Sequence, residues 1–281
     1  MNGLSVIDET FDPNISSSYF ISIQVSLDGF SFCTLDPVRN KYIQLRHIPF
    51  SRNESLVQQI EKCFEETELL NLPFKKTFVL IPSRHSTLVP SAIFKPEKKE
   101  EWLNFCVQHE NDQLTFFNKV KMADAFNVFA VPAAVYTIIN RQFPDPQFFH
   151  QHTPIIENGL SARATSNESA SLMIHLNKDF FDVVVFEKGR LQLCNSFPIR
   201  SDNDFIYFTL LIFEQLKLEP AQTEVILSGW HPDFNGLYRH LANYIKNIRQ
   251  TELPGSFVYS YHFKEFRSSG FYNLLSLAAC V

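Results

Sequence analysis

The sequence predicts an α/β protein with two similar lobes around a central cleft. Two stretches that lie 151 residues apart, Phe20–Asp36 and Ser171–Glu187, share one strand–turn–strand pattern, and superposing them places Asp28 on Asp179. In both halves a helix and a short apolar strand follow this hairpin. Such alternation is typical of sheets covered by helices. A unit that occurs twice in one chain predicts a duplicated architecture whose loops face the cleft.

Strands and one helix are predicted in close succession at the start of the first half. Three apolar or alternating runs separated by turns predict strands, and Ser51 or Asn53 is placed to cap the helix that follows them. A short apolar run then predicts a strand that is buried in a covered sheet. The predicted strands are 20–25, 30–36, 42–48 and 77–82, and the predicted helix is 51–70.

The region from about 83 to 131 interrupts this succession and is predicted to be an inserted subdomain. Pro96 opens a helix there, because proline fits the first helical turn, where a backbone N–H has no partner. Strands are predicted near 91–94 and at 114–119 and 127–131. Pro132 then begins a helix that ends at residue 141, and Pro144–Pro146 is the predicted linker. The first lobe is therefore expected to comprise residues 1–146.

The second lobe, residues 147–281, is predicted to repeat this plan. Lys188 and Gly189 between two apolar runs are a strong hairpin signal, and Ser201 or Asp202 is placed to cap the next helix. The predicted strands are 147–152, 172–176, 182–187, 190–197 and 224–228, and the predicted helices are 202–216, 235–245 and 271–281. We expect the last helix to dock against the second lobe, since it lacks the Lys and Arg residues of helices that lie on membranes.

Composition and charge argue against several classes of protein. A hydrophobic fraction of 45% with 20% charged residues is typical of soluble globular proteins. A net charge of −5 argues against a nucleic-acid partner, and no run approaches the roughly 20 apolar residues of a membrane span. The 5 cysteines are scattered without C-x-x-C spacing, which favours reduced thiols. We therefore expect a cytoplasmic protein.

The order of the predicted elements resembles the actin-like ATPase superfamily, which includes actin, Hsp70 chaperones and sugar kinases. The hairpin at 172–187 and the segment 224–241 resemble its second phosphate loop and its adenosine loop. More specifically, the chain looks like an uncharacterised bacterial family with a degenerate actin-like fold, distantly similar to the actin-like adaptors of pilus assembly and cell division. The resemblance implies a duplicated actin-like ATPase (ribonuclease H-like) fold with two lobes around a cleft.

The nucleotide motifs that this resemblance implies are altered. In the first phosphate loop, Gln24 stands where the superfamily has an acid and Ser26 where it has a glycine, and a neutral amide does not replace the charge that holds hydrated Mg²⁺. In the second loop, His175, Asn177 and Asp179 fall in a motif that has lost its three glycines, so backbone N–H groups cannot approach a phosphate as closely. Asp179 also adds negative charge beside a polyphosphate.

The adenosine loop is also altered. Gly229 is kept after its buried strand, but Trp230 replaces the second glycine of the usual pair. An indole there fills the space of an adenine unless it swings away or stacks on the base. With all three motifs changed, we expect no catalytic residue and no cofactor. The degenerate positions of the cleft are Gln24, Ser26, His175, Asn177, Asp179, Gly229 and Trp230.

Two further groups of residues are candidate binding sites. His150 and His152 are spaced to place two imidazoles on one face of a strand, as in some metal sites. No third ligand of suitable spacing lies nearby, so we interpret the pair as a polar strand edge and expect no metal. The loop Ser83–Ser86 follows a buried strand, where ligands sit in α/β folds, although turn chemistry explains it equally well.

The leading functional hypothesis is a pseudo-ATPase scaffold or adaptor that binds another, unidentified protein. Binding would use the interlobe cleft or the insert, whose aromatic residues are either partner anchors or the insert's own core. These aromatic residues are Trp102, Phe105, Phe116, Phe117 and Phe126. The alternative hypothesis is a small-molecule or nucleotide binder, or an enzyme, that uses the cleft with altered chemistry. A homodimer and a self-assembling filament are both compatible with the sequence.

Overall fold

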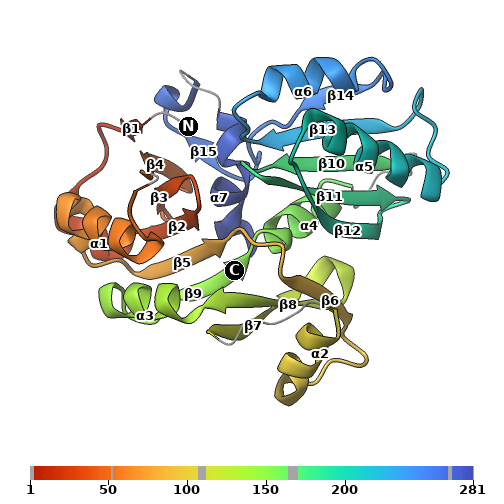
Figure 1. Cartoon of the computed structure of the whole chain (residues 1–281). Coiled ribbons are helices and arrows are strands. Elements are labelled where there is room, and N and C mark those ends of the chain that lie inside the picture. The colour runs from red at the N-terminus through yellow and green to blue at the C-terminus, as the bar shows by residue number, and fades with distance from the viewer. Residues whose placement is uncertain (1–2, 52, 107–111, 164–169, 265–267, 281) are drawn as a thin grey trace.

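Two sheets with the same strand order form the body of the molecule in the computed structural model (Figure 1). The structure describes residues 3–51, 53–106, 112–163, 170–264 and 268–280. Within these ranges, no helix combines the length and the apolar character needed to cross a membrane.

The first sheet has the strand order β1-β4-β3-β2-β5-β9, and β15 also pairs with β4. Its core is formed by apolar side chains such as Ile23, Phe32 and Val79, which pack against the helices α1 and α3. Ser55 caps α1 through a capping box with Gln58, in place of the predicted Ser51 or Asn53. The elements are β1 (Leu4–Ile7), β2 (Phe20–Ser26), β3 (Gly29–Asp36), β4 (Lys41–Pro49), α1 (Leu56–Glu66), β5 (Lys76–Ile81), α3 (Ala133–Gln142), β9 (Gln147–His150) and β15 (Val258–Tyr259).

The second sheet has the order β12-β11-β10-β13-β14 and repeats the pattern of the first. β10 pairs with β11 in the register that β2 makes with β3, so Leu176 faces Phe181 as Val25 faces Phe30. Each first hairpin strand also has a parallel neighbour, β13 or β5. The elements are α4 (His152–Ser161), β10 (Ser171–Leu176), β11 (Phe180–Glu187), β12 (Arg190–Pro198), α5 (Asp202–Gln215), β13 (Glu224–Gly229), α6 (Phe234–Leu241) and β14 (Ile248–Gln250).

The insert is a separate sheet, of order β6-β8-β7, that packs against one helix. Its elements are β6 (Ser86–Pro90), α2 (Lys99–Cys106), β7 (Gln113–Val120) and β8 (Ala125–Pro132). The strand predicted near 91–94 was wrong, because the strand is β6 and these residues form the turn that follows it. Phe94 leaves the strand direction there to stack on Phe126, with ring centroids 4.1 Å apart.

The chain does not change sheets where the sequence predicted. The strand expected to open the second lobe at 147–152 is shorter: it is β9, which pairs parallel with β5 in the first sheet, and α4 begins at His152. Phe148 is buried in the first core, which explains why the strand joins that sheet. The change of sheet therefore falls after residue 150 and not between residues 146 and 147.

The C-terminal helix α7 (Tyr272–Ser276) lies between the two sheets (Figure 1). Phe271, Leu274 and Leu275 pack against the first sheet, whereas Tyr272 packs against the second. The helix therefore packs against the second lobe, as predicted, and also against the first, which was not predicted. Because α7 is short and apolar on several sides, it is buried by both lobes and helps to join them. Val281, which the sequence placed in this helix, lies outside the described residues.

We expect Gly229→Ala to destabilise the protein by roughly 2–4 kcal/mol. Gly229 has φ +81°, and a Cβ there would overlap the carbonyl oxygen of Leu176 on the adjacent strand. The N–H of Trp230 donates to this same carbonyl at 2.8 Å, so the backbone has no room to move away. Urea unfolding measures the change. The matched control is Gly255→Ala, whose Cβ would meet nothing within 4 Å; an equal loss in both variants would contradict this reasoning.

Candidate functional site

The residues of the predicted nucleotide cleft enclose a cavity of only about 20 Å³. Gln24, Ser26, His175, Asn177 and Trp230 line it. A buried water needs ~10–15 Å³ measured in this way, whereas sites for small molecules are usually ~300–1,000 Å³. The cavity therefore has room for one water. Of the remaining predicted positions, Asp179 lines a different cavity and Gly229 packs on Leu176.

Two residues outside the predicted motifs, His47 and Phe271, fill the space of this site. His47 from β4 and Phe271 from the C-terminal segment line the small cavity, and their ring centroids are 6.0 Å apart. His47 Nδ1 is 2.8 Å from the Ser31 hydroxyl, and His175 Nδ1 is 2.9 Å from the Ser228 hydroxyl. No local pattern marks His47 or Phe271, because each reaches the cleft through tertiary packing.

Both cleft histidines are neutral at neutral pH. Burial lowers the pKa of His47 to about 4 and that of His175 to about 4, because the charged imidazolium loses its hydration there. His47 Nε2 is buried and has no hydrogen-bond partner among the described residues. The cleft thus presents uncharged imidazoles where a nucleotide site would need cations or a metal ion.

A larger cavity, of about 270 Å³, lies on the other side of the two hairpin tips. It is bounded by both lobes and by the insert, and its walls are largely apolar. Arg84 and Lys178 bring positive charge to it from opposite lobes, and Asp28 and Asp179 bring negative charge. The lining residues are Val25–Asp28, Leu56, Ile81–His85, Gln113, Ala130, Pro132, Val135 and Asn177–Phe180. The loop after β5 that the sequence singled out therefore does face a cavity.

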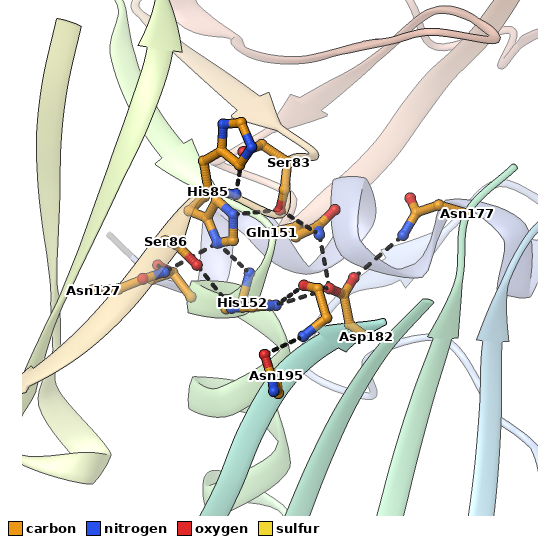
Figure 2. A network of polar contacts seen from close by, with 12 residues as sticks. Ser83, His85, Ser86, Asn127, Gln151, His152, Asn177, Asp182 and Asn195 are labelled. Atoms are coloured by element: carbon orange, nitrogen blue, oxygen red, sulfur yellow. Dashed lines mark hydrogen bonds and ion pairs between the residues drawn. The ribbon is translucent and has the colours of Figure 1, made fainter. Parts of the chain in front are cut away.

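A buried carboxylate, Asp182, links the two lobes (Figure 2). Asp182 has no exposed surface. From the segment that joins the lobes, Gln151 Nε2 donates to it at 2.9 Å and His152 Nε2 lies 2.8 Å away. From the second lobe, the Ser196 hydroxyl donates at 2.5 Å and Asn177 Nδ2 at 3.2 Å. Four donors therefore satisfy the two carboxylate oxygens.

The same network continues into the first lobe and the insert. His150 Nε2 and Gln151 Nε2 both lie within hydrogen-bond distance of the Ser83 carbonyl, at 2.9 and 3.1 Å. Asn127 Nδ2 on β8 is 3.2 Å from His150 Nδ1. The two imidazoles thus have different side-chain partners, while their ring centroids lie 4.5 Å apart, edge to face. The sequence interpretation of a polar strand edge underestimated this pair, because their partners come from three separate parts of the chain.

Ser86, His152 and Asp182 have the contacts of a hydrolytic triad but not its protonation. The Ser86 hydroxyl is 3.2 Å from His152 Nδ1. Burial alone would lower the pKa of His152, but the adjacent Cys194 sulfur and the Asp182 carboxylate raise it to about 10. A general base works best with a pKa near 7. The raised pKa keeps the proton on His152 at neutral pH and favours its ion pair with Asp182.

The aromatic residues of the insert have two different environments. Phe116 packs on Tyr136 and Phe148, and Phe126 stacks on Phe94, so both belong to packed cores. Phe105 at the end of α2 is 87% exposed. Trp102 also packs against the insert core, whereas Phe117 is 37% exposed. Three of the five predicted anchors therefore serve internal packing.

Comparison with known proteins places the chain in a family and a fold. A family model described as "Protein of unknown function (DUF3822)" matches residues 8–248, and no curated protein matches. A Bacteroides thetaiotaomicron protein with an actin-like ATPase fold and unknown function has a TM-score of 0.81 and 28% identity, over 86% of this chain and 94% of that one. The PilM–PilN type IV pilus biogenesis complex has a TM-score of 0.58 and 13% identity, over 92% and 97%. The predicted actin-like ATPase fold is confirmed.

We expect Asp182→Asn to cost about 3–5 kcal/mol, because it breaks a buried ion pair. His152 binds its proton more tightly in the folded state, so this stabilisation is present below its ordinary pKa of about 6.5 and is lost as pH rises through about 10. Urea unfolding at several pH values should give a difference from wild type that shrinks above pH 6.5. Asp179→Asn, on the same hairpin but exposed, is the control; a difference independent of pH would contradict the ion pair.

Acid should destabilise the protein through His47 and His175. Both are neutral when folded and take up protons when unfolded, so their contribution is present above pH 6.5 and is lost as pH falls toward about 4. The double variant His47→Gln, His175→Gln should show a shallower loss of unfolding free energy between pH 6.5 and 4. His240→Gln, in α6, is the control. Parallel curves for the double variant and wild type would refute this assignment.

Proposed function

The chain belongs to the DUF3822 family of proteins of unknown function and has an actin-like ATPase fold, and from this premise we propose that it is a non-hydrolysing scaffold that binds another protein. The observation that carries the proposal is the small volume of the former nucleotide site. Side chains from both lobes and from the C-terminal segment leave a cavity of about 20 Å³ there.

Chemistry at the cleft supports the loss of ATP hydrolysis. Phosphoryl transfer needs a metal held by carboxylates and donors that neutralise the developing charge. Gln24 supplies an amide in place of a carboxylate, and His175 is neutral and hydrogen-bonded to Ser228. The buried carboxylate of the second hairpin, Asp182, already accepts from four side chains. Three of these contacts are on Oδ1 and one is on Oδ2, so the carboxylate is engaged by the protein's own donors.

The cavity of about 270 Å³ is the proposed docking site for the partner. Partner binding is usually dominated by a few apolar or aromatic side chains that enter well-packed pockets. Here both hairpin tips, the loop after β5 and the insert surround one apolar cavity, and Arg84, Lys178 and Asp179 form a charged rim. An apolar side chain of the partner would fill the cavity, and polar neighbours would meet the rim.

The PilM–PilN complex supports the proposal that this chain binds another protein. In it, a protein that shares this fold is found in complex with another protein. Because the sequence identity to this chain is low, the comparison concerns the fold and not the partner. The kind of partner has to be inferred from the residues that line this chain's own cavity.

A second candidate is a small-molecule binder that uses the same cavity. Its volume of about 270 Å³ is near the lower end of ligand sites, and it presents charges of both signs. A compact polar molecule would suit it better than a nucleotide.

Two measurements test the proposal. Titration with Mg-ATP at millimolar concentration should give neither heat nor a rise in melting temperature, since a ligand that binds the folded state stabilises it. Tight binding of Mg-ATP would contradict the proposal that the nucleotide site is lost.

Affinity capture from a lysate of the source organism tests the docking site. Leu27→Asp places a charge at the cavity, on a hairpin tip residue that is 67% exposed. Val38→Asp is the matched control, at an aliphatic turn residue that is 88% exposed and lines neither cavity. A partner that wild type and Val38→Asp retain and Leu27→Asp loses would support the proposal. If Leu27→Asp still captures the partner, the partner docks elsewhere on the protein. If wild type retains a small metabolite and no protein partner, the second candidate is favoured.

A further inference from the structure

Helix α5 has an apolar outer side. Phe205 and Phe213 pack into the core of the second lobe, and the helix carries no charged side chain between them. On the opposite side, Tyr207 is 62% exposed, and Leu210 and Leu211 are partly exposed. The outer face of a surface helix is normally polar. An apolar outer face on such a helix is typical of a surface that another molecule covers.

Other helices that cover the two sheets show the ordinary pattern. In α6, which packs into the same core as α5, Leu237 is buried, and the exposed residues include Asn235 and Arg239. In α1, on the first sheet, Lys62 and Glu65 are exposed. The apolar outer side of α5 therefore departs from the pattern of these helices.

The apolar side chains continue from α5 onto β12, the edge strand of the second sheet. The ring centroids of Tyr207 and Phe208 are 5.3 Å apart, and those of Phe208 and Phe197 on β12 are 4.9 Å apart. Both phenylalanines are partly exposed, so the apolar surface is wider than the helix alone. This α5 surface consists of Tyr207, Phe208, Leu210, Leu211 and Phe197.

The polar residues at the ends of this surface complement an antiparallel copy of α5. Asp202 precedes it, and Glu214 and Lys217 follow it; all three are exposed. None of the three forms an ion pair with another described residue. A two-fold axis between positions 210 and 211 relates position 207 to position 214, because both are equally distant from it. The Tyr207 hydroxyl then faces the Glu214 carboxylate of the second copy, and Lys217 faces the acidic first turn of that copy's α5.

We propose that the chain forms a two-fold symmetric dimer in which the α5 surfaces of two copies pack antiparallel. At the centre, Leu210 and Leu211 of both copies exclude water, and the polar pairs flank them on each side. A pattern that complements its own reversal favours a second copy of the chain over an unrelated partner, since a two-fold interface joins the same surface on both subunits. No described residue of α5 or β12 lines the proposed docking cavity, so a dimer carries two such cavities.

The mass of the full chain in solution tests the dimer. Between about 1 µM and about 100 µM, sedimentation velocity should show a rise from the mass of one chain to that of two. Tyr207→Asp removes the aromatic ring and places a carboxylate beside Glu214 of the second copy. It should raise the dissociation constant at least about tenfold, as the loss of a central aromatic residue does. Tyr261→Asp, at a tyrosine that is 57% exposed outside the α5 surface, is the matched control and should dimerise as wild type does.

Two results of this experiment would overturn the proposal. One is a wild-type protein that stays monomeric over the whole range, and the other is a Tyr207→Asp variant that dimerises as tightly as Tyr261→Asp. Urea unfolding checks that each variant is folded. If Tyr207→Asp is unfolded, the cross-linking experiment below decides.

Cross-linking tests the antiparallel orientation. In the proposed dimer the two copies of position 211 lie next to the axis, so mild oxidation of Leu211→Cys should give a disulfide-linked dimer. The two copies of position 203 are separated by about 22 Å along the helices, whereas a disulfide needs Cα atoms within about 7 Å. Asn203→Cys should therefore give no more cross-linked dimer than wild type, whose exposed Cys106 sets the background. Equal cross-linking of Leu211→Cys and Asn203→Cys would contradict this arrangement.

Discussion

Asp182 is a charge in a fully buried position, and the arrangement of the two lobes depends on the donors that it requires. An unpaired carboxylate in such a place costs several kcal/mol, roughly as much as a domain's net stability. Its donors come from the start of α4, from Ser196 on β12 and from Asn177 in the turn after β10. Gln151 and His150 also contact the Ser83 carbonyl, so the first lobe and the second share one polar network.

Side chains from distant parts of the chain fill the cleft between the two hairpins. An ATPase of this fold needs space between its hairpins, whereas here His47, Phe271 and Trp230 occupy that space beside the two tips. The C-terminal segment contributes to both features, since Phe271 lines the small cavity and Tyr272 packs against the second lobe. A larger, mostly apolar cavity with a charged rim lies on the side of the insert.

The fold of this protein and the chemistry of its cleft residues therefore give separate information about its function. An actin-like fold is compatible with kinases, chaperones, filaments and adaptors, so it does not assign a function. The particular residues narrow the choice. In this chain the hairpin region holds a buried carboxylate paired with His152 and two histidines that burial keeps neutral.

The sequence by itself determined the duplicated hairpins and the strands of the insert, because period-two apolar patterns and Gly and Pro positions are local signals. It placed Val25 on Leu176, and the structure has these residues at the same register position. Only the tertiary structure decided that β9 joins the first sheet, that α7 lies between the lobes and that His47 and Phe271 fill the cleft. The contact between His152 and Asp182 was equally impossible to predict from local sequence. These contacts join residues 30 or more positions apart, and their stability comes from burial and shared donors, which no short stretch of sequence encodes.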